Sequence, residues 1–206
     1  MLKVRRIGAF SVLASVLLIG SLAVPTSATT LKFGAKLTTS TQPQDASTCN
    51  DENPDIPVGA SCTWIAQVAF ENGSHFKAPA NGTIKKLRLV ACDGGSFTLQ
   101  LVKPNSTGTK WKLVKTGPVI HYAADPRQSA GNCGGDNSDD YIIQTFKINV
   151  AVQTGEYIAV KTAKNGMLHC SGDSMPMYYP ALASGQGFRT KTGGTGCALL
   201  VQLQYG

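Results

Sequence analysis

An acidic cluster at residues 136–140 has the chemistry that a hard cation requires. Asp136, Asp139 and Asp140 carry carboxylates, and Asn137 and Ser138 lie between them. Ca²⁺ prefers carboxylate and amide oxygens, and a loop of a β-domain could hold a structural Ca²⁺ on such residues. The order of the residues departs from the spacing of an EF-hand loop. We therefore favour a solvated turn here, with a structural Ca²⁺ as the alternative.

Ser174 lies in the segment that comes closest to a nucleophile motif. Residues 170–176 read Cys-Ser-Gly-Asp-Ser-Met-Pro, whereas chymotrypsin-like proteases present their serine in Cys-x-Gly-Asp-Ser-Gly-Gly-Pro. Such a serine needs a histidine within hydrogen-bond distance and backbone N–H groups arranged as an oxyanion hole. Met175 replaces the first glycine of that pattern, and none of the three histidines has the sequence context of the catalytic base. We expect a turn beside a disulfide, and predict that Ser174 is not a nucleophile.

Aromatic side chains form the third group of candidates. A flat ring can stack on the face of a sugar while neighbouring polar groups bind its rim. Residues 175–180 form an apolar stretch within an otherwise polar segment, which favours an exposed binding surface. Trp111, Tyr178 and Tyr179 are therefore the candidate ligand-binding residues. For most of the aromatic rings, however, we favour core packing or a loop plug.

Six cysteines, spaced without any Cys-x-x-Cys pair, indicate structural disulfides rather than a zinc site or thiol redox chemistry. Six cysteines allow fifteen pairings, and sequence alone does not choose among them. Proximity along the chain, and glycines beside two of the cysteines, favour three local bridges. The predicted pairs are Cys49 with Cys62, Cys92 with Cys133, and Cys170 with Cys197.

Residues 1–28 have the order of a secretory signal peptide. Three basic residues precede an apolar stretch at 7–24, and small residues follow at 26–28. A retained N-terminal anchor is the alternative. Cleavage after Ala28 predicts a secreted, extracellular protein of residues 29–206 with no membrane span after processing.

The formal charge of +7 falls to +4 when the leader, with three basic and no acidic residues, is removed. Mild basicity is compatible with attraction to an acidic wall or polysaccharide. The remaining basic residues are scattered, without a run of five or six like charges, so the sequence predicts no nucleic-acid partner.

The elements that must position these residues are β-strands, because apolar residues alternate with polar ones along most of the chain. Helical periodicity is poor, and Ile84 is out of phase with Leu87, which predicts a bulge near Lys85 and Lys86. Residues 123–140 and 163–196 are glycine-rich and polar and are expected to be long connections. The predicted strands are at 64–70, 84–91, 97–101, 111–115, 119–122, 146–150, 157–162 and 199–205.

These elements predict an all-β protein. Residues 29–61 form an N-terminal strand and polar arm, and residues 62–206 form a single antiparallel β-sandwich of jelly-roll type with about eight or nine strands.

Two segments carry a resemblance to known proteins. Residues 76–103 and 146–160 include Phe76, Asn81-Gly82 and Phe97, then Phe146, Val150 and Gly155. This pattern resembles exported bacterial proteins of unassigned function. The resemblance implies a jelly-roll-like β-sandwich and carries no activity.

Together these features favour a secreted, non-catalytic domain that binds a glycan or another cell-surface component. One alternative is a secreted serine hydrolase using Ser174, and another is an extracellular structural or protease-inhibiting protein. The sequence leaves open the oligomeric state and the glycosylation of Asn72, Asn81 and Asn105.

Overall fold

The structure is a computed structural model of the 206-residue chain, and it describes residues 30–38, 43, 46–67, 75–127, 133 and 141–206. These residues form antiparallel strands and a single four-residue helix, α1 (Cys49–Glu52). No helix in this part of the chain is long and apolar enough to cross a membrane. The prediction of a mostly β protein is confirmed. The predicted leader and the acidic cluster of Asp136, Asp139 and Asp140 lie outside the described residues.

The strands form three sheets, and the described residues contain more strands than the eight or nine predicted. The four-stranded sheet has the order β1 (Lys32–Gly34), β13 (Val201–Tyr205), β4 (Gly82–Leu89) and β7 (Gln144–Val152). The seven-stranded sheet has the order β11 (Arg189–Thr190), β6 (Lys110–Tyr122), β5 (Gly95–Pro104), β8 (Tyr157–Thr162), β3 (Cys62–Ile65), β10 (Leu168–Tyr178) and β12 (Gly193–Leu199). A small two-stranded sheet joins β2 (Ser47–Thr48) to β9 (Lys164–Asn165).

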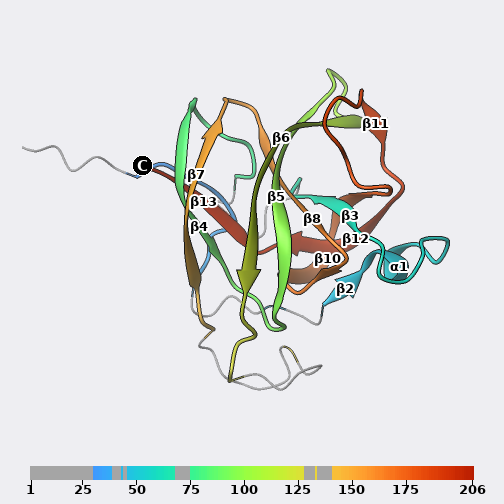
Figure 1. Ribbon diagram of the computed structural model, residues 1–206, viewed down its shortest axis with the longest axis horizontal. Helices are drawn as coiled ribbons and strands as arrows, with labels where there is room; N and C mark the ends of the chain where they lie inside the picture. The colour runs from blue at the N-terminus through green and yellow to red at the C-terminus, as the bar shows by residue number, and fades with distance from the viewer. Residues whose placement is uncertain (1–29, 39–42, 44–45, 68–74, 128–132, 134–140) are drawn as a thin grey trace, which may run out of the picture.

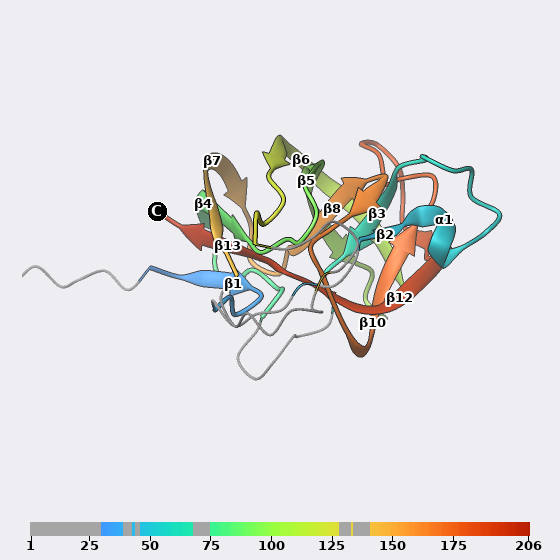
Figure 2. The same ribbon diagram turned by 90° about the horizontal axis from the view of Figure 1, so that it is seen from below.

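The main hydrophobic core draws side chains from both large sheets. Leu87 and Leu203 of the four-stranded sheet belong to the same buried cluster as Leu99 and Val160 of the seven-stranded sheet. The chain passes from one sheet to the other between β12 and β13, which Figure 1 shows as one long red ribbon. Figure 2 shows β4, β13 and β1 on one side of the molecule, away from β3, β10 and β12.

The predicted alternation is confirmed in the central strands. Phe97, Leu99 and Leu101 on β5 are buried, as the period of two requires. A register shift between Ile84 and Lys86 gives β4 one residue more than β13 at this point. The predicted bulge at Lys85 is therefore present, and it explains why Ile84 and Leu87 can both face the core.

Two predictions about the positions of strands were wrong. Residues 163–196 are not a long connection, because they contain β9, β10, β11 and β12. The alternation is hidden in β10 because neighbouring residues 175–178 are all buried, so both faces of this strand are covered. Residues 111–115 and 119–122 are not separate strands but parts of β6, in which a register shift accommodates Gly117 and Pro118.

The structure contains the three disulfides in the predicted pairing: Cys49–Cys62, Cys92–Cys133 and Cys170–Cys197. Cys170 and Cys197 are opposite each other in the β10–β12 pair. Cys49 and Cys62 join α1 to β3. The N-terminal arm is thus attached to the body by a covalent bond and by the pairing of β1 with β13.

Candidate functional site

Trp111 and Tyr178 lie together, but they are core residues and not an exposed platform. Their side chains are 3% and 1% exposed, and they belong to a second buried cluster with Ile65 and Leu182. The Trp111 ring meets the ring of Tyr157 edge to face, with 4.9 Å between ring centroids. Core packing, which the sequence favoured for most of the aromatic rings, therefore describes these two, and their small exposed fractions leave little ring surface for a sugar.

Three buried hydrogen bonds hold Leu182, which packs against these rings. The Leu182 amide donates to Thr63 Oγ1 at 2.9 Å, and the Gln100 side chain donates to the Leu182 carbonyl at 3.0 Å. Thr63 Oγ1 in turn donates to Gln100 Oε1 at 2.8 Å. All three residues are buried. Buried polar groups that satisfy one another in this way fix one arrangement of the chain.

Tyr179 is half-buried, and its backbone is also held. Its amide donates to Thr192 Oγ1 at 2.7 Å, and its carbonyl accepts from Arg189 Nη2 at 3.0 Å. The same guanidinium donates through Nη1 to the Pro180 carbonyl at 2.7 Å. Residues 179–188 connect β10 to β11 and form a cover whose buried residue, Leu182, packs against Trp111 and Tyr178. Burial raises the pKa of Tyr178 beneath it to about 12, although the charge of Arg189 lowers that pKa in part.

The structure offers a cluster with metal-ligand geometry at Cys92, Asp93 and Cys133. Cys92 and Cys133 form a disulfide, so neither sulfur is a thiolate. The Asp93 carboxylate forms an ion pair with Lys164 at 3.0 Å. This cluster is therefore explained by a structural bridge and an ion pair.

Ser174 lies in β10, so the expected turn at this position is a strand. The side chains of residues 171–174 lie outside the described part of the structure. The prediction that Ser174 is not a nucleophile stays a prediction.

Basic side chains gather on the outer face of the four-stranded sheet. Lys32 is the register partner of Gln204, Gln204 of Lys86, and Lys86 of Lys147, so these four residues form one row across all four strands. Arg88 stands in the next row on the same face. The three lysines are exposed and Arg88 is half-buried, whereas the residues alternating with them on β4 point into the core. We call Lys32, Lys86, Arg88 and Lys147 the basic face.

Glutamines on β13 hold Arg88 in place. Arg88 Nη1 donates to Gln202 Oε1 at 3.0 Å, and Gln204 Nε2 donates to the same oxygen at 3.1 Å. The Gln202 amide nitrogen donates to the Ala35 carbonyl at 2.8 Å, which fixes its orientation. Beside them lies a hollow of about 260 Å³, whose lining includes Lys32, Lys36, His75 and Arg88. The guanidinium is thus oriented by neutral amide and carbonyl groups.

The basic face has no carboxylate partner within the described residues. The described residues form the ion pairs Lys103–Glu156, Arg127–Asp125 and Lys164–Asp93, and none of these pairs includes a residue of the basic face. Lys86 and Lys147 are direct cross-strand neighbours, and like charges in such positions destabilise a sheet. Folding alone gives no reason for this arrangement, so it is a candidate for binding an anionic ligand.

The basic face could not be recognised from the sequence because its residues are far apart in the chain. Lys86 and Arg88 are two residues apart on one predicted strand, which does place them on one side. Their proximity to Lys147 and Lys32 depends on strand order and register, which the alternation of residue types does not specify.

Comparison with protein family models, with curated proteins and with solved structures found no match to this chain.

Proposed function

We propose that this protein is a secreted, non-catalytic domain that binds an acidic cell-surface glycan through the basic face. The observation that carries the proposal is the row of Lys32, Lys86 and Lys147 across four paired strands, with Arg88 beside it. A polymer with repeated carboxylate, sulfate or phosphate groups can contact several of these cations at once. Each exposed contact is weak in salt water, but contacts made by one chain reinforce one another.

The shape of the basic face favours a polymer over a single small anion. Strands are spaced by about 4.8 Å, so the row from Lys32 to Lys147 extends over about 14 Å. One carboxylate or phosphate reaches only a part of this length. Exposed Thr145 and Asn149 on β7 add hydroxyl and amide groups that can bond sugar hydroxyls beside the charged row.

Two further features support an extracellular role. Three disulfides are typical of proteins that fold in an oxidising compartment. Residues 1–28 also support export, because basic residues, an apolar stretch and small residues follow one another in the order of a signal peptide.

We also propose that the two large sheets pack face to face as a β-sandwich of jelly-roll type. The shared core cluster and the passage of the chain from β12 to β13 support this arrangement, since sandwiches are formed by strands that exchange between two packed sheets.

The test is retention of residues 29–206 on immobilised acidic polysaccharide, with neutral polysaccharide in parallel. We expect retention on the acidic polymer alone, weakening steadily with salt. The double variant Lys86→Ala with Lys147→Ala should bind about tenfold more weakly, because two of the cations in the row are lost.

The control variant is Lys161→Ala with Lys191→Ala, which removes the same charge from exposed positions outside the four-stranded sheet. It should bind within about twofold of the parent protein. Equal weakening by both double variants would mean that net charge alone drives retention, and the proposed site would be wrong. Equal retention on the neutral polymer would also contradict the proposal.

A further inference from the structure

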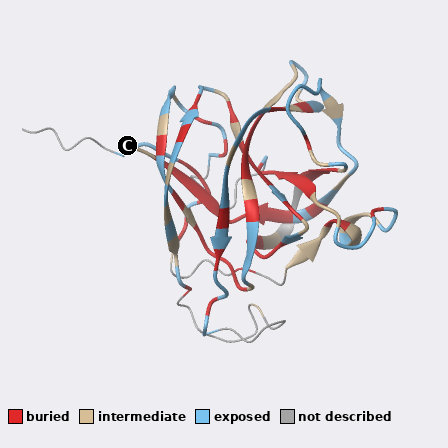
Figure 3. Cartoon of the chain, in the orientation of Figure 1, coloured by how far each residue is buried: buried red, intermediate tan, exposed pale blue. Residues whose placement is uncertain are grey.

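A groove of about 840 Å³ lies between β6 and β7, along residues 115–121 of the first strand and 145–151 of the second. The two strands run in opposite directions beside each other (Figure 1). β7 is the end strand of the four-stranded sheet, and beyond Trp111 β6 pairs only with β5. Figure 3 shows much exposed or half-buried surface on both strands.

Side chains bridge the groove at its two ends. At one end, Lys115 Nζ donates to the Ala151 carbonyl at 3.0 Å. At the other end, Gln144 Nε2 donates to the Ala123 carbonyl at 2.8 Å, and the Ala123 amide donates to Gln144 Oε1 at 3.0 Å. The Gln144 side chain thus forms with Ala123 the pair of hydrogen bonds that a strand backbone would form.

Between these bridges, the facing edges have no strand partner among the described residues. β6 uses its other edge to pair with β5, and β7 uses its other edge to pair with β4. No backbone hydrogen bond crosses the groove from residues 116–121 to residues 145–150. Unpaired N–H and C=O groups in a row form a template on which another strand can pair.

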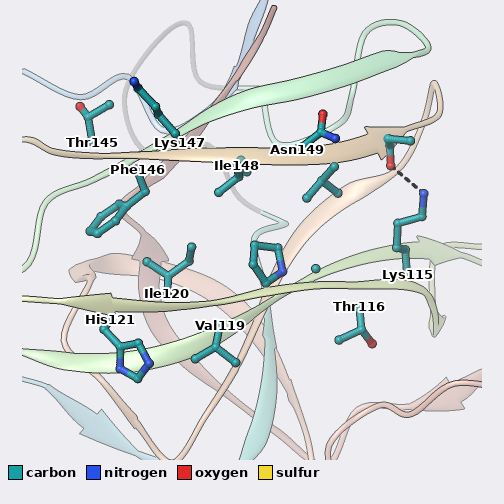
Figure 4. Close-up of a pocket in the computed structure, with 14 residues that line it drawn as sticks. Lys115, Thr116, Val119, Ile120, His121, Thr145, Phe146, Lys147, Ile148 and Asn149 are labelled. Carbon is teal, nitrogen blue, oxygen red and sulfur yellow. Dashed lines mark hydrogen bonds between the residues drawn. The ribbon is translucent and has the colours of Figure 1, made fainter.

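The groove is apolar within and basic at its rim. Figure 4 shows Phe146, Ile148 and Ile120 pointing into the space between the strands, while Thr145 and Lys147 point away from it. Phe146 and Ile148 are only half-buried, although they stand on the core side of β7. The residues lining the groove include lysines and a histidine but no carboxylate.

We propose that this groove binds an extended segment of another polypeptide, which adds to β7 as an antiparallel strand. A polypeptide is the class of ligand whose N–H and C=O groups repeat with the spacing of a strand edge. Its alternate apolar side chains would contact Phe146, Ile148 and Ile120. The open edge of six residues, 145–150, corresponds to about 20 Å of extended chain.

β7, not β6, is the pairing edge because β6 is interrupted. Pro118 has no backbone N–H, and Gly117 and Pro118 lie where the β5–β6 register shifts. β7 has no proline between residues 144 and 152. Lysines line the groove and no carboxylate does, so acidic residues in the guest segment are favoured.

The test uses the folded chain and a capped eight-residue peptide of alternating valine and threonine with a glutamate at each end. We expect saturable binding, with slower amide hydrogen exchange at residues 145–150 in the complex. The variant Ile148→Asn should weaken binding about tenfold, because it puts an amide into the apolar wall. Thr116→Asn, on β6 but pointing away from the space, should bind within about twofold.

A second peptide, with alternate backbone amides N-methylated, separates strand addition from apolar docking. It should bind at least about tenfold more weakly, because it cannot complete the hydrogen-bond ladder. Equal binding of the two peptides, no binding below about 1 mM, or binding without protection at residues 145–150 would each overturn the proposal. An oligosaccharide that protects these amides would likewise overturn it. Failure of the polysaccharide test on the basic face would leave the peptide result unaffected. The polysaccharide test changes Lys86 and Lys147, whereas the peptide test changes Ile148.

Discussion

The outer faces of the two large sheets differ in what covers them. On the seven-stranded sheet, Leu182 of the connection between β10 and β11 packs with the buried Trp111 and Tyr178 in a second cluster. On the four-stranded sheet, Lys86 and Lys147 stay exposed beside each other. One face gains stability by excluding water from aromatic rings, whereas the other retains charges that repel one another. The difference teaches that the buried aromatic cluster and the exposed basic row belong to different sheets of this protein.

The largest expected effect is on the covered face. Tyr178→Ala should lower the free energy of unfolding by about 3–5 kcal/mol, because it removes a fully buried ring and leaves a cavity. Urea unfolding measures the loss. Tyr179→Ala, at the half-buried neighbour, should cost less than about half as much. Similar losses for the two variants would mean that the cover does not exclude water from Tyr178.

Next in size is the loss of the Cys170–Cys197 disulfide. The strands of the four-stranded sheet contain no cysteine, while this bridge joins β10 to β12 in the other sheet. Replacing both cysteines with alanine should cost about 3.5 kcal/mol, as expected for a loop of 27 residues on the chain-entropy model. Hydrogen exchange should accelerate in β10 and β12 before β4 and β7. Uniform acceleration would contradict a local effect.

Alkaline pH should weaken the covered face as well. Burial raises the pKa of Tyr178 from 10.0 to about 12, so the folded state favours the neutral phenol. This stabilisation is complete below pH 10 and is lost as the pH rises through about 12. It amounts to at most about 2.7 kcal/mol. Unfolding measured from pH 9 to 12 should therefore show a smaller decline for Tyr178→Phe than for the parent. Parallel declines would show that other groups dominate.

The smallest effect is expected on the open face. Lys147→Thr should leave the free energy of unfolding unchanged or raise it by up to about 1 kcal/mol, because the repulsion from Lys86 is relieved. Added salt should remove the gain, since it screens exposed charges. Lys161→Thr serves as the control on the other sheet. A destabilisation by Lys147→Thr that exceeds the control would mean that the lysine stem contributes packing.

Much of the fold could be predicted because its causes are local. The alternation at Phe97, Leu99 and Leu101 follows from the geometry of one strand, and the bulge at Lys85 from a break in that alternation. The cysteine pairs were predictable because each joins neighbours along the chain. β10 could not be recognised, since residues 175–178 are buried on both faces and show no alternation.

The candidate site could be predicted only in part. The interpretation of basicity as attraction to an acidic polysaccharide stays a prediction. Of the aromatic residues named as candidates for sugar stacking, Trp111 and Tyr178 are buried and Tyr179 is half-buried. Phe146, Ile148 and Val150 were predicted as one face of a strand, and they do share that face. Their partial exposure in a groove depends on how far β7 stands from β6, which no local pattern encodes.

The sequence by itself determined the strands that alternate and the absence of long helices among the described residues, because both depend on residues close together in the chain. It favoured the three cysteine pairs, and the structure decided among the fifteen possible pairings. Only the tertiary structure decided that Tyr178 is covered and that Lys32, Lys86 and Lys147 share a row. Burial and register join segments separated by many tens of residues. A shift of one residue in any of these pairings would turn the same lysines toward the core.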